Sequence, residues 1–241
     1  MYTAAAGMAA QQTHLDAVAN DLANVNTTGY KHVRVAFRDL LYATGGRAVD
    51  GSVQFGAGAA ATDIGRSLQQ GGLQSTGQPL DVALQGNGFI AVRGSDGKPS
   101  MTRDGSLRLD DRNRLVTADG LLLDPPVSVA AGTDPKDIEI SARGDVAVGG
   151  RKVGALRLVT VPAPSQLEGG PDNTFRATRA SGGAIAAPAG TTLAQGSLEG
   201  SNVDMGESMA AMMEAQRGFE MASKAITFSD QMAEIANGVK R

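Results

Sequence analysis

The chain has 241 residues, enough for one large domain or two ordinary ones with a sizeable hydrophobic core. Its 22 Lys and Arg against 25 Asp and Glu give a formal charge of -3, which removes the electrostatic basis for general nucleic-acid binding. The absence of Cys excludes disulfides, thiolate metal sites and cysteine nucleophiles, and the presence of only two His nearly excludes histidine-based metal and acid–base clusters.

The N-terminal segment has the pattern of an amphipathic helix of about two dozen residues. Its large apolar residues recur with heptad spacing, and Gln11 occupies the vacant position: Met8, Leu15, Val18, Leu22 and Val25. The helix should end within residues 24–29, because Asn, Thr and Gly there tolerate turn and left-handed conformations.

The next segment, residues 31–47, is basic and contains large apolar residues. It contains one acidic residue, Asp39, and four basic residues, Lys31, Arg34, Arg38 and Arg47. A run of this kind is usually a solvated surface, but aromatic and arginine residues together favour a contact patch. We therefore expect an interface that includes Tyr30, Phe37, Leu41 and Tyr42.

Between residues 43 and 198 the helical pattern disappears. Residues 43–75, rich in Gly, Ala, Ser and Gln, are typical of an extended connector. Residues 76–198 contain every proline and a series of short alternating runs separated by turn residues, which predicts an all-β domain. The predicted strands lie in residues 88–94, 106–110, 114–123, 126–130, 137–141, 145–150 and 153–161.

The C-terminal segment predicts a helix that runs to Arg241. Ser201 or Asn202 could cap its start, and Asp204 and Glu207 place negative charge in the first turn. One apolar stripe recurs every seven residues: Met205, Met212, Phe219, Ile226 and Ala233. A second stripe lies on nearly the opposite face: Met221, Phe228, Met232, Ile235 and Val239. Two apolar stripes indicate that the helix contacts two partners. The alternative is burial inside a monomeric bundle, but the chain offers only one other long helix to cover it.

These elements together predict an α+β fold in which the two terminal helices pack as a coiled-coil-like pair and an all-β domain is inserted between them. The predicted division is residues 1–42 with 199–241 as the terminal-helix domain, 43–75 as the connector and 76–198 as the β domain.

No motif predicts catalysis, a metal site or a cofactor site. The glycine pair in residues 85–89 precedes a strand instead of opening a helix, so it does not match a phosphate-binding loop. The aspartates of the β region lie mostly at hairpin turns, where Asp is favoured by backbone geometry. His14 and His32 have no second His or Cys nearby in the sequence, so each indicates a surface or interface position.

Six stretches resemble the axial proteins of the bacterial flagellum, which are the rod, hook and hook-associated proteins. "ANDLANVNTTGYK" at residues 19–31 is similar to the N-terminal signature of that family. "LEGSNVD" at 198–204 and "EAQRGFEMASKAITFSDQM" at 214–232 are similar to its C-terminal signature. "PLDVALQGNGFIAV" and "TRDGSLRLDDRNRLVTADGLLL" are similar to its β domain, and "FRDLLYATGG" at 37–46 resembles the distal rod members most.

The resemblance implies a structural subunit that self-assembles into a hollow helical rod, transmits torque and encloses an export channel, with no enzymatic activity. Its implied partners are copies of itself, other rod proteins, the hook protein, the flagellar type III export apparatus and ring proteins. Assembly residues implied by the signatures add Asn24, Asn26, Gly29, Asn202, Val203, Gln216 and Arg217 to the apolar positions above.

The implied location is the flagellar basal body in the cell envelope. The sequence favours no membrane insertion, and export without a cleaved signal peptide, because it contains neither a long apolar run nor a basic leader. Two alternatives stay open: a proximal rod or hook-type member, and a monomeric β domain that binds or hydrolyses cell-wall glycan.

Overall fold

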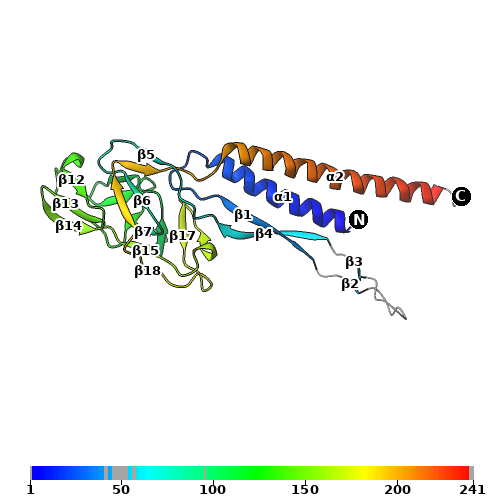
Figure 1. Ribbon diagram of the computed structural model, residues 1–241, viewed down its shortest axis with the longest axis horizontal. Coiled ribbons are helices and arrows are strands. Elements are labelled where there is room, and N and C mark those ends of the chain that lie inside the picture. Colours follow the sequence, from blue (N-terminus) through cyan, green and yellow to red (C-terminus); the bar gives the residue numbers. More distant parts are fainter. Residues whose placement is uncertain (1, 41–42, 45–53, 56–57, 95, 239–241) are drawn as a thin grey trace. The chain divides into compact units, whose positions relative to one another are not determined.

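The computed structural model describes residues 2–40, 43–44, 54–55, 58–94 and 96–238, and they form two compact units (Figure 1). The helical unit comprises Met1–Ala23, Val33–Ile64 and Asp204–Arg241. The β-rich unit comprises Asn24–His32 and Gly65–Val203. The chain is therefore α+β, with a helix at each end and β structure between them, as predicted.

The N-terminal helix α1 spans Tyr2–Ala23, and its predicted end is confirmed. After Ala23 the chain turns, with the Thr27 N–H donating to the Asn24 carbonyl at 3.1 Å. Val18 of the predicted apolar seam is buried, and its companions Met8, Leu15 and Leu22 are half-buried. Ala10, which the seam did not include, is as deeply buried as Val18.

The C-terminal helix α2 spans Met205–Gly238. The predicted cap at Ser201 or Asn202 is wrong, because Asp204 caps the helix: its Oδ1 accepts from the Glu207 N–H at 2.9 Å and its carbonyl from the Ser208 N–H at 2.9 Å. The side chain of Asn202 is engaged elsewhere: its Oδ1 accepts from the His32 N–H at 2.8 Å, and its Nδ2 donates to the carbonyls of Ser67 and Gln69.

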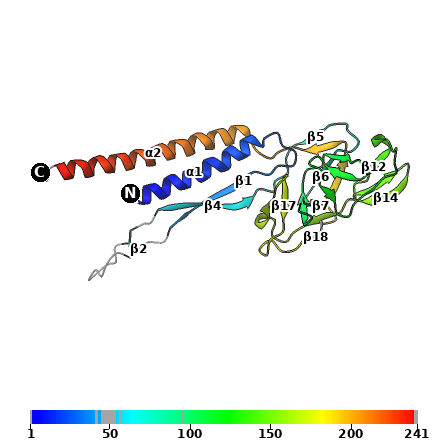
Figure 2. The same cartoon turned by 180° about the vertical axis from the view of Figure 1, so that it is seen from behind.

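Helices α1 and α2 lie side by side and run in opposite directions (Figures 1 and 2). Small residues of α2 form most of the contact. Ala215 is fully buried, and a Cβ placed on Gly218 would lie 2.9 Å from the Gln11 side chain. The half-buried residues of this face are Ser208, Ala211, Met212, Gly218, Ala222, Ile226 and Ser229. Over the described residues, neither helix combines the length and apolar character that crossing a bilayer requires.

A two-stranded arm of β1 (Val33–Asp39) and β4 (Ala59–Arg66) completes the helical unit, with the short pair β2 (Ala43–Thr44) and β3 (Gln54–Phe55). The arm contacts α1: the Phe37 and His14 rings meet edge to face at 5.4 Å, and the buried Asp21 carboxylate accepts from the Val33 N–H at 3.0 Å. The segment predicted as an extended connector thus contains strands β2 to β5, and part of it packs with the helices.

The β-rich unit is built from short strands. They are β5 (Leu73–Ser75), β6 (Val82–Gln85), β7 (Phe89–Arg93), β8 (Pro99–Thr102), β9 (Leu107–Leu109), β10 (Leu115–Thr117), β11 (Leu122–Leu123), β12 (Ile138–Ile140), β13 (Asp145–Val148), β14 (Arg151–Ala155), β15 (Leu158–Thr160), β16 (Glu168–Gly169), β17 (Thr174–Arg176), β18 (Ile185–Ala186), β19 (Thr192–Gln195) and β20 (Ser197–Glu199). Two 3-10 turns add Pro135–Asp137 and Pro164–Gln166. The strand predicted at 126–130 is reduced to the isolated bridge Arg114↔Ser128, where the Leu115 N–H donates to the Val127 carbonyl at 2.9 Å and the Val129 N–H to the Asn113 carbonyl at 2.8 Å. Pro125 and Pro126 lack N–H donors, so the pairing does not continue toward the start of this segment.

Strand β7 is the centre of the largest sheet, whose order is β16-β17-β8-β7-β11-β10-β9, with β15 also paired to β7 and β18 to β15. Successive side chains of β7 enter different cores because they point to opposite faces of the sheet. Ile90 and Val92 join a cluster with Leu84 and Leu115. Phe89 and Ala91 join a second cluster that contains Phe175. Both faces of this strand are therefore buried.

Candidate assembly surfaces and the buried junction

The two terminal signatures meet inside the β-rich unit, where residues 24–32 and 199–203 form what we call the junction. The Gly29 N–H donates to the Glu199 carbonyl at 2.8 Å, and the Asn202 N–H to the Tyr30 carbonyl at 3.3 Å. The His32 N–H donates to Asn202 Oδ1 at 2.8 Å. Backbone groups from opposite ends of the chain thus satisfy one another.

A buried ion cluster of Lys31, Arg103 and Glu199 lies at the junction. Lys31 Nζ is 2.5 Å from Glu199 Oε1, and Arg103 Nη1 is 3.2 Å from the same oxygen. The side chains of Lys31 and Glu199 are 0% exposed, and that of Arg103 is 1% exposed. A charged group with no contact to water is stable only when partners replace its hydration, so the three side chains depend on one another.

The cluster contains two cations and one anion, and neutral groups supply the remaining contacts. Lys31 Nζ donates to the Gln69 carbonyl at 2.7 Å, and Arg103 Nη2 to the Gly86 carbonyl at 3.0 Å. The Arg103 guanidinium lies 5.4 Å from the centre of the Phe89 ring, while its buried Nε has no hydrogen-bond partner among the described residues. Burial lowers the pKa of Lys31 below its usual value, even though Glu199 acts to raise it.

Gly29 holds the junction in a conformation that a side chain would prevent. Its φ is +67°, and a Cβ there would lie 2.6 Å from the Arg103 carbonyl carbon. We expect Gly29→Ala to lower the free energy of unfolding by about 3 kcal/mol or more, from the left-handed backbone and the clash together. Urea unfolding of the full chain measures this loss.

Gly77→Ala is the matched control, because Gly77 has the same φ of +67° but nothing within 4 Å of its added Cβ. It should lose only the backbone part, about 1–2 kcal/mol. Equal losses at Gly29 and Gly77 would contradict the close approach to Arg103.

The signature residues predicted as assembly positions lie mostly in or beside the junction. Gly29 and Tyr30 are buried, and Asn24, Val25, Asn202 and Val203 are half-buried. Asn26 is exposed. Phe37, on the arm, keeps 48% of its surface exposed despite the His14 contact, and Leu41 and Tyr42 lie outside the described residues.

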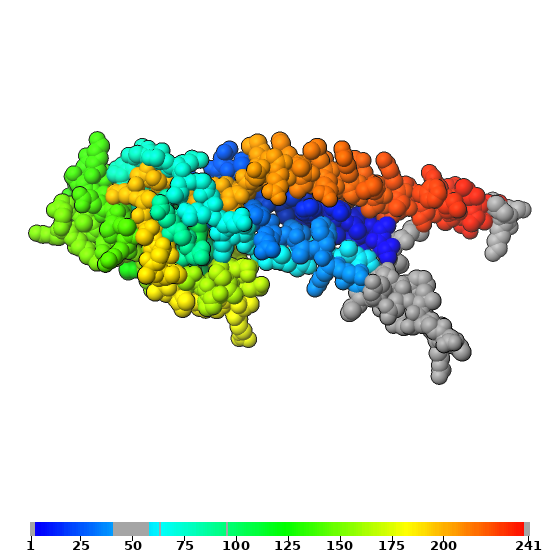
Figure 3. Space-filling model, in the orientation of Figure 1, coloured from blue at the N-terminus to red at the C-terminus, as the bar shows by residue number. Residues whose placement is uncertain are grey.

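The second predicted stripe of α2 is exposed, and Figure 3 shows α2, in orange to red, at the surface of the helical unit. We call its four described large residues the outer stripe: Met221 is 67% exposed, Phe228 65%, Met232 54% and Ile235 62%. Residues 230–238 are all exposed, because α2 extends beyond the N-terminus of α1 (Figure 1). Four large apolar side chains exposed on the same helix indicate a contact surface.

The first predicted stripe divides between buried and exposed positions. Met212 and Ile226 are half-buried on the face toward α1, whereas Met205 and Phe219 are exposed. Gln216 and Arg217 are exposed as well. The sequence thus identified two apolar stripes on α2, and the structure places only Met212 and Ile226 of the first stripe toward α1.

Sequence reasoning missed the ion cluster. Lys31 belongs to the basic segment predicted as a contact patch, and neither Arg103 nor Glu199 was singled out as a functional residue. The one available signal was a single acid, Glu199, inside the strand-like run that precedes α2. Among the described residues, no group of three or more His, Asp or Glu side chains is arranged to hold a metal ion.

Three sequence families match the chain. Residues 1–31 match the family described as flagella basal body rod protein, residues 83–148 the flagellar hook protein FlgE/F/G D1 domain, and residues 194–239 the flagellar basal body rod FlgEFG protein C-terminal family.

Whole-length relatives agree with these matches. Flagellar basal-body rod protein FlgG of Borreliella burgdorferi is 38% identical over 100% of this chain and 98% of its own length. The FlgG protein of Caulobacter vibrioides is 36% identical over 99% of this chain and 98% of its own. Flagellar basal-body rod protein FlgF of Escherichia coli is 34% identical over 98% of this chain.

Proposed function

The chain belongs to the family of flagellar basal-body rod proteins, and we propose that it assembles with copies of itself into the distal part of the rod. Membership of this family makes it a structural protein of the flagellum. The observation that carries self-assembly is the outer stripe, where a helix of a structural subunit exposes four large apolar side chains. Burying each would contribute about 1.5–3 kcal/mol, so the stripe favours the assembled state.

Two helix contacts follow from the proposal. The small-residue face of α2, centred on the fully buried Ala215, would pack on α1 as a coiled-coil-like pair within one subunit. The outer stripe would pack on helices of neighbouring subunits. Contacts between two different surfaces do not form a closed two-fold dimer, and they generate a helical filament when the rotation between neighbours does not close a ring.

The assembly interface that we propose combines the outer stripe with the exposed positions of the signatures. On α2 these are Met205, Gln216, Arg217 and Phe219, and elsewhere Asn26 and Phe37. The buried Gly29 and Tyr30 would contribute indirectly, by holding the junction in shape. The terminal segments, residues 1–42 and 199–241, would thus be the assembling part, 43–75 a strap between neighbours, and 76–198 the β domain.

Family membership implies assembly with other rod and hook components of the flagellum. The specific neighbours that we propose are copies of the same chain, the adjoining rod proteins and the hook protein. Delivery by the flagellar type III export apparatus, contact with ring proteins and a position in the cell envelope belong to the same proposal. The named relatives are structural rod proteins, so we propose no enzymatic reaction for this chain.

Electron microscopy of the purified full chain at high concentration tests this function. We expect tubes or fibres above a critical concentration and dispersed particles below it. The critical concentration should fall as salt strengthens apolar association, since kosmotropic salts favour burial of the outer stripe.

The matched control is the chain without residues 227–241, which keeps all of the half-buried face toward α1 except Ser229 and removes Phe228, Met232 and Ile235. This variant should remain dispersed. Particles that stay monomeric for the full chain at every concentration and salt would contradict the proposal.

A further inference from the structure

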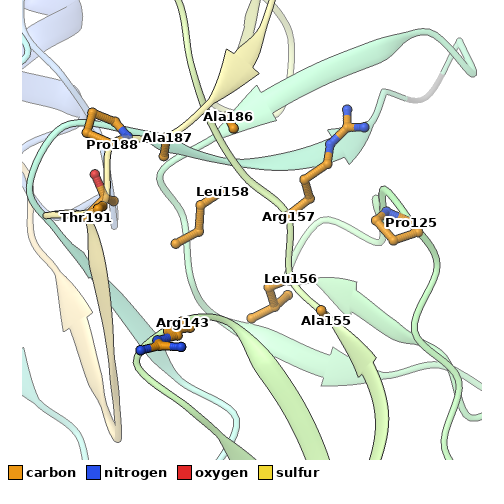
Figure 4. A pocket seen from close by; sticks show the side chains of 11 residues that line it. Pro125, Arg143, Ala155, Leu156, Arg157, Leu158, Ala186, Ala187, Pro188 and Thr191 are labelled. Atoms are coloured by element: carbon orange, nitrogen blue, oxygen red, sulfur yellow. The ribbon is translucent and has the colours of Figure 1, made fainter.

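The β-rich unit has an open pocket of about 640 Å³, which we call the arginine groove (Figure 4). Leu156 and Leu158 form its floor, and Pro188 and Thr191 line one side. Arg143 and Arg157 stand at its rim. Its volume lies within the range of ordinary ligand pockets, and an apolar floor with a few polar groups is typical of a binding site.

The rim of the groove carries an excess of positive charge. Arg143, exposed in the turn between β12 and β13, forms no ion pair or hydrogen bond with the residues that the structure describes. Arg157 shares the Asp124 carboxylate, at 3.3 Å, with Arg93, at 3.4 Å. The groove lining thus contains two guanidinium groups and no carboxylate, in a chain whose formal charge is -3. The groove favours an occupant that carries a carboxylate beside a small apolar group.

The same chain presents such a group at the turn between β16 and β17, which we call the hairpin tip, residues 168–173. Asp172 and Asn173 both have positive φ, 56° and 48°, as a tight two-residue turn requires. Gly170 donates to the Thr174 carbonyl at 2.7 Å, and Asn173 Nδ2 to the Thr28 carbonyl at 2.9 Å. The tip is therefore held in one shape, which reduces the entropy lost on binding.

The tip is acidic, exposed and narrow. Glu168, Pro171 and Asp172 are exposed, and the Asp172 carboxylate forms no ion pair or hydrogen bond with the described residues. Burial raises the pKa of Asp119 above its usual value, and the charges of Asp104 and Asp172 add to this rise. Gly169 and Gly170 have no side chains, so Pro171 and Asp172 are the residues of the tip that would contact a partner first.

We propose that the arginine groove of one copy binds the hairpin tip of a second copy, with Asp172 opposite Arg143 and Pro171 on the Leu156 and Leu158 floor. This inference rests on the proposed function, because it supplies self-assembly with a contact between β-rich units. The groove and the tip are different surfaces, so each copy can bind two others, and the contact extends a filament instead of closing a dimer.

A charge exchange tests the pairing. Arg143→Glu and Asp172→Arg should each raise the critical concentration for assembly of the full chain about tenfold, because each opposes like charges at the contact. The double variant Arg143→Glu/Asp172→Arg should return it to near the original value. Arg151→Glu and Asp111→Arg, at exposed positions outside the groove and the tip, are the matched controls and should change it little.

Cross-linking gives a readout that does not need filaments. The chain contains no Cys, so an Arg143→Cys copy mixed with an Asp172→Cys copy should be joined by a short bismaleimide faster than either copy alone, and faster than an Arg151→Cys copy with the same partner. Equal rates for Arg143→Cys and Arg151→Cys, or a double variant that assembles no better than the single ones, would overturn the pairing. Failure of the unmodified chain to assemble would instead contradict the proposed function.

Discussion

We expect Glu199→Gln to lower the free energy of unfolding of the β-rich unit by about 3–5 kcal/mol, since it removes the only anion from the buried ion cluster. The amide keeps the size of the carboxylate but leaves Lys31 and Arg103 as two buried cations at one site. It also weakens the acceptor for the Gly71 N–H, now 2.9 Å from Glu199 Oε1. For a unit of this size the loss corresponds to roughly 6–20 °C in Tm, measured by the circular dichroism of the β structure.

Two comparisons make this result specific. Asp145→Asn removes an exposed ion pair with Lys152 and should cost about 0–1 kcal/mol. Lys31→Met removes the surplus cation and leaves Glu199 paired with Arg103, so its loss should be smaller than that of Glu199→Gln. If Glu199→Gln and Asp145→Asn gave the same Tm, the cluster would contribute nothing to stability and its role at the junction would have to be abandoned.

The double substitution Phe228→Asp/Ile235→Asp should abolish assembly without changing the fold of the isolated chain. Both side chains are exposed, so the monomer loses no core contacts. In the assembled state the change removes about 3–6 kcal/mol of apolar burial per subunit and adds charges that must be desolvated. The critical concentration should rise more than about a hundredfold, as measured by sedimentation, and motility of cells carrying the variant should be lost.

Two variants show which face of α2 is responsible. Phe228→Leu keeps an apolar side chain and should assemble nearly normally. Ile226→Asp places a charge on the half-buried face toward α1, so it should lower the stability of the monomer as well as assembly. Normal motility of the Phe228→Asp/Ile235→Asp variant would show that the outer stripe faces solvent or an open channel.

The elements themselves could be predicted because their signals are local. Heptad spacing from Met8 to Val25 placed α1, and alternation with turn residues placed strands such as β7, β12 and β13 within a residue or two of their bounds. The two apolar stripes of α2 were predicted for the same reason: a 3.6-residue period assigns each residue to a face whatever the partner is.

The junction could not be predicted because its contacts are not local. Lys31 and Glu199 are 168 positions apart, and each alone is a charged residue of the kind that is usually exposed. The same limit explains the cap of α2. Ser201, Asn202 and Asp204 are all favourable caps by local rules, and Asp204 rather than Asn202 caps the helix because Asn202 Oδ1 already accepts from the His32 N–H.

The pairing of β1 with β4 could not be predicted from the sequence for a related reason. Strand β4 is short of large apolar residues and rich in Ala, so by composition it resembled a connector. Its order comes from β1, which lies more than twenty residues earlier, and the arm in turn contacts α1 through Phe37. Contacts supplied by another element override a weak local preference.

The separation of Lys31 from Glu199 also determines when the β-rich unit can finish folding. The ribosome delivers residue 31 first and residue 199 only 168 residues later. The pairing of β6 with β19, through Val82↔Gln195 and its neighbours, has to wait just as long. During vectorial delivery the chain therefore lacks both the last strands of its β structure and the anion for two cations. Completion of the native state is coupled to release of the C-terminal segment, so an emerging chain stays open until almost all of it has arrived.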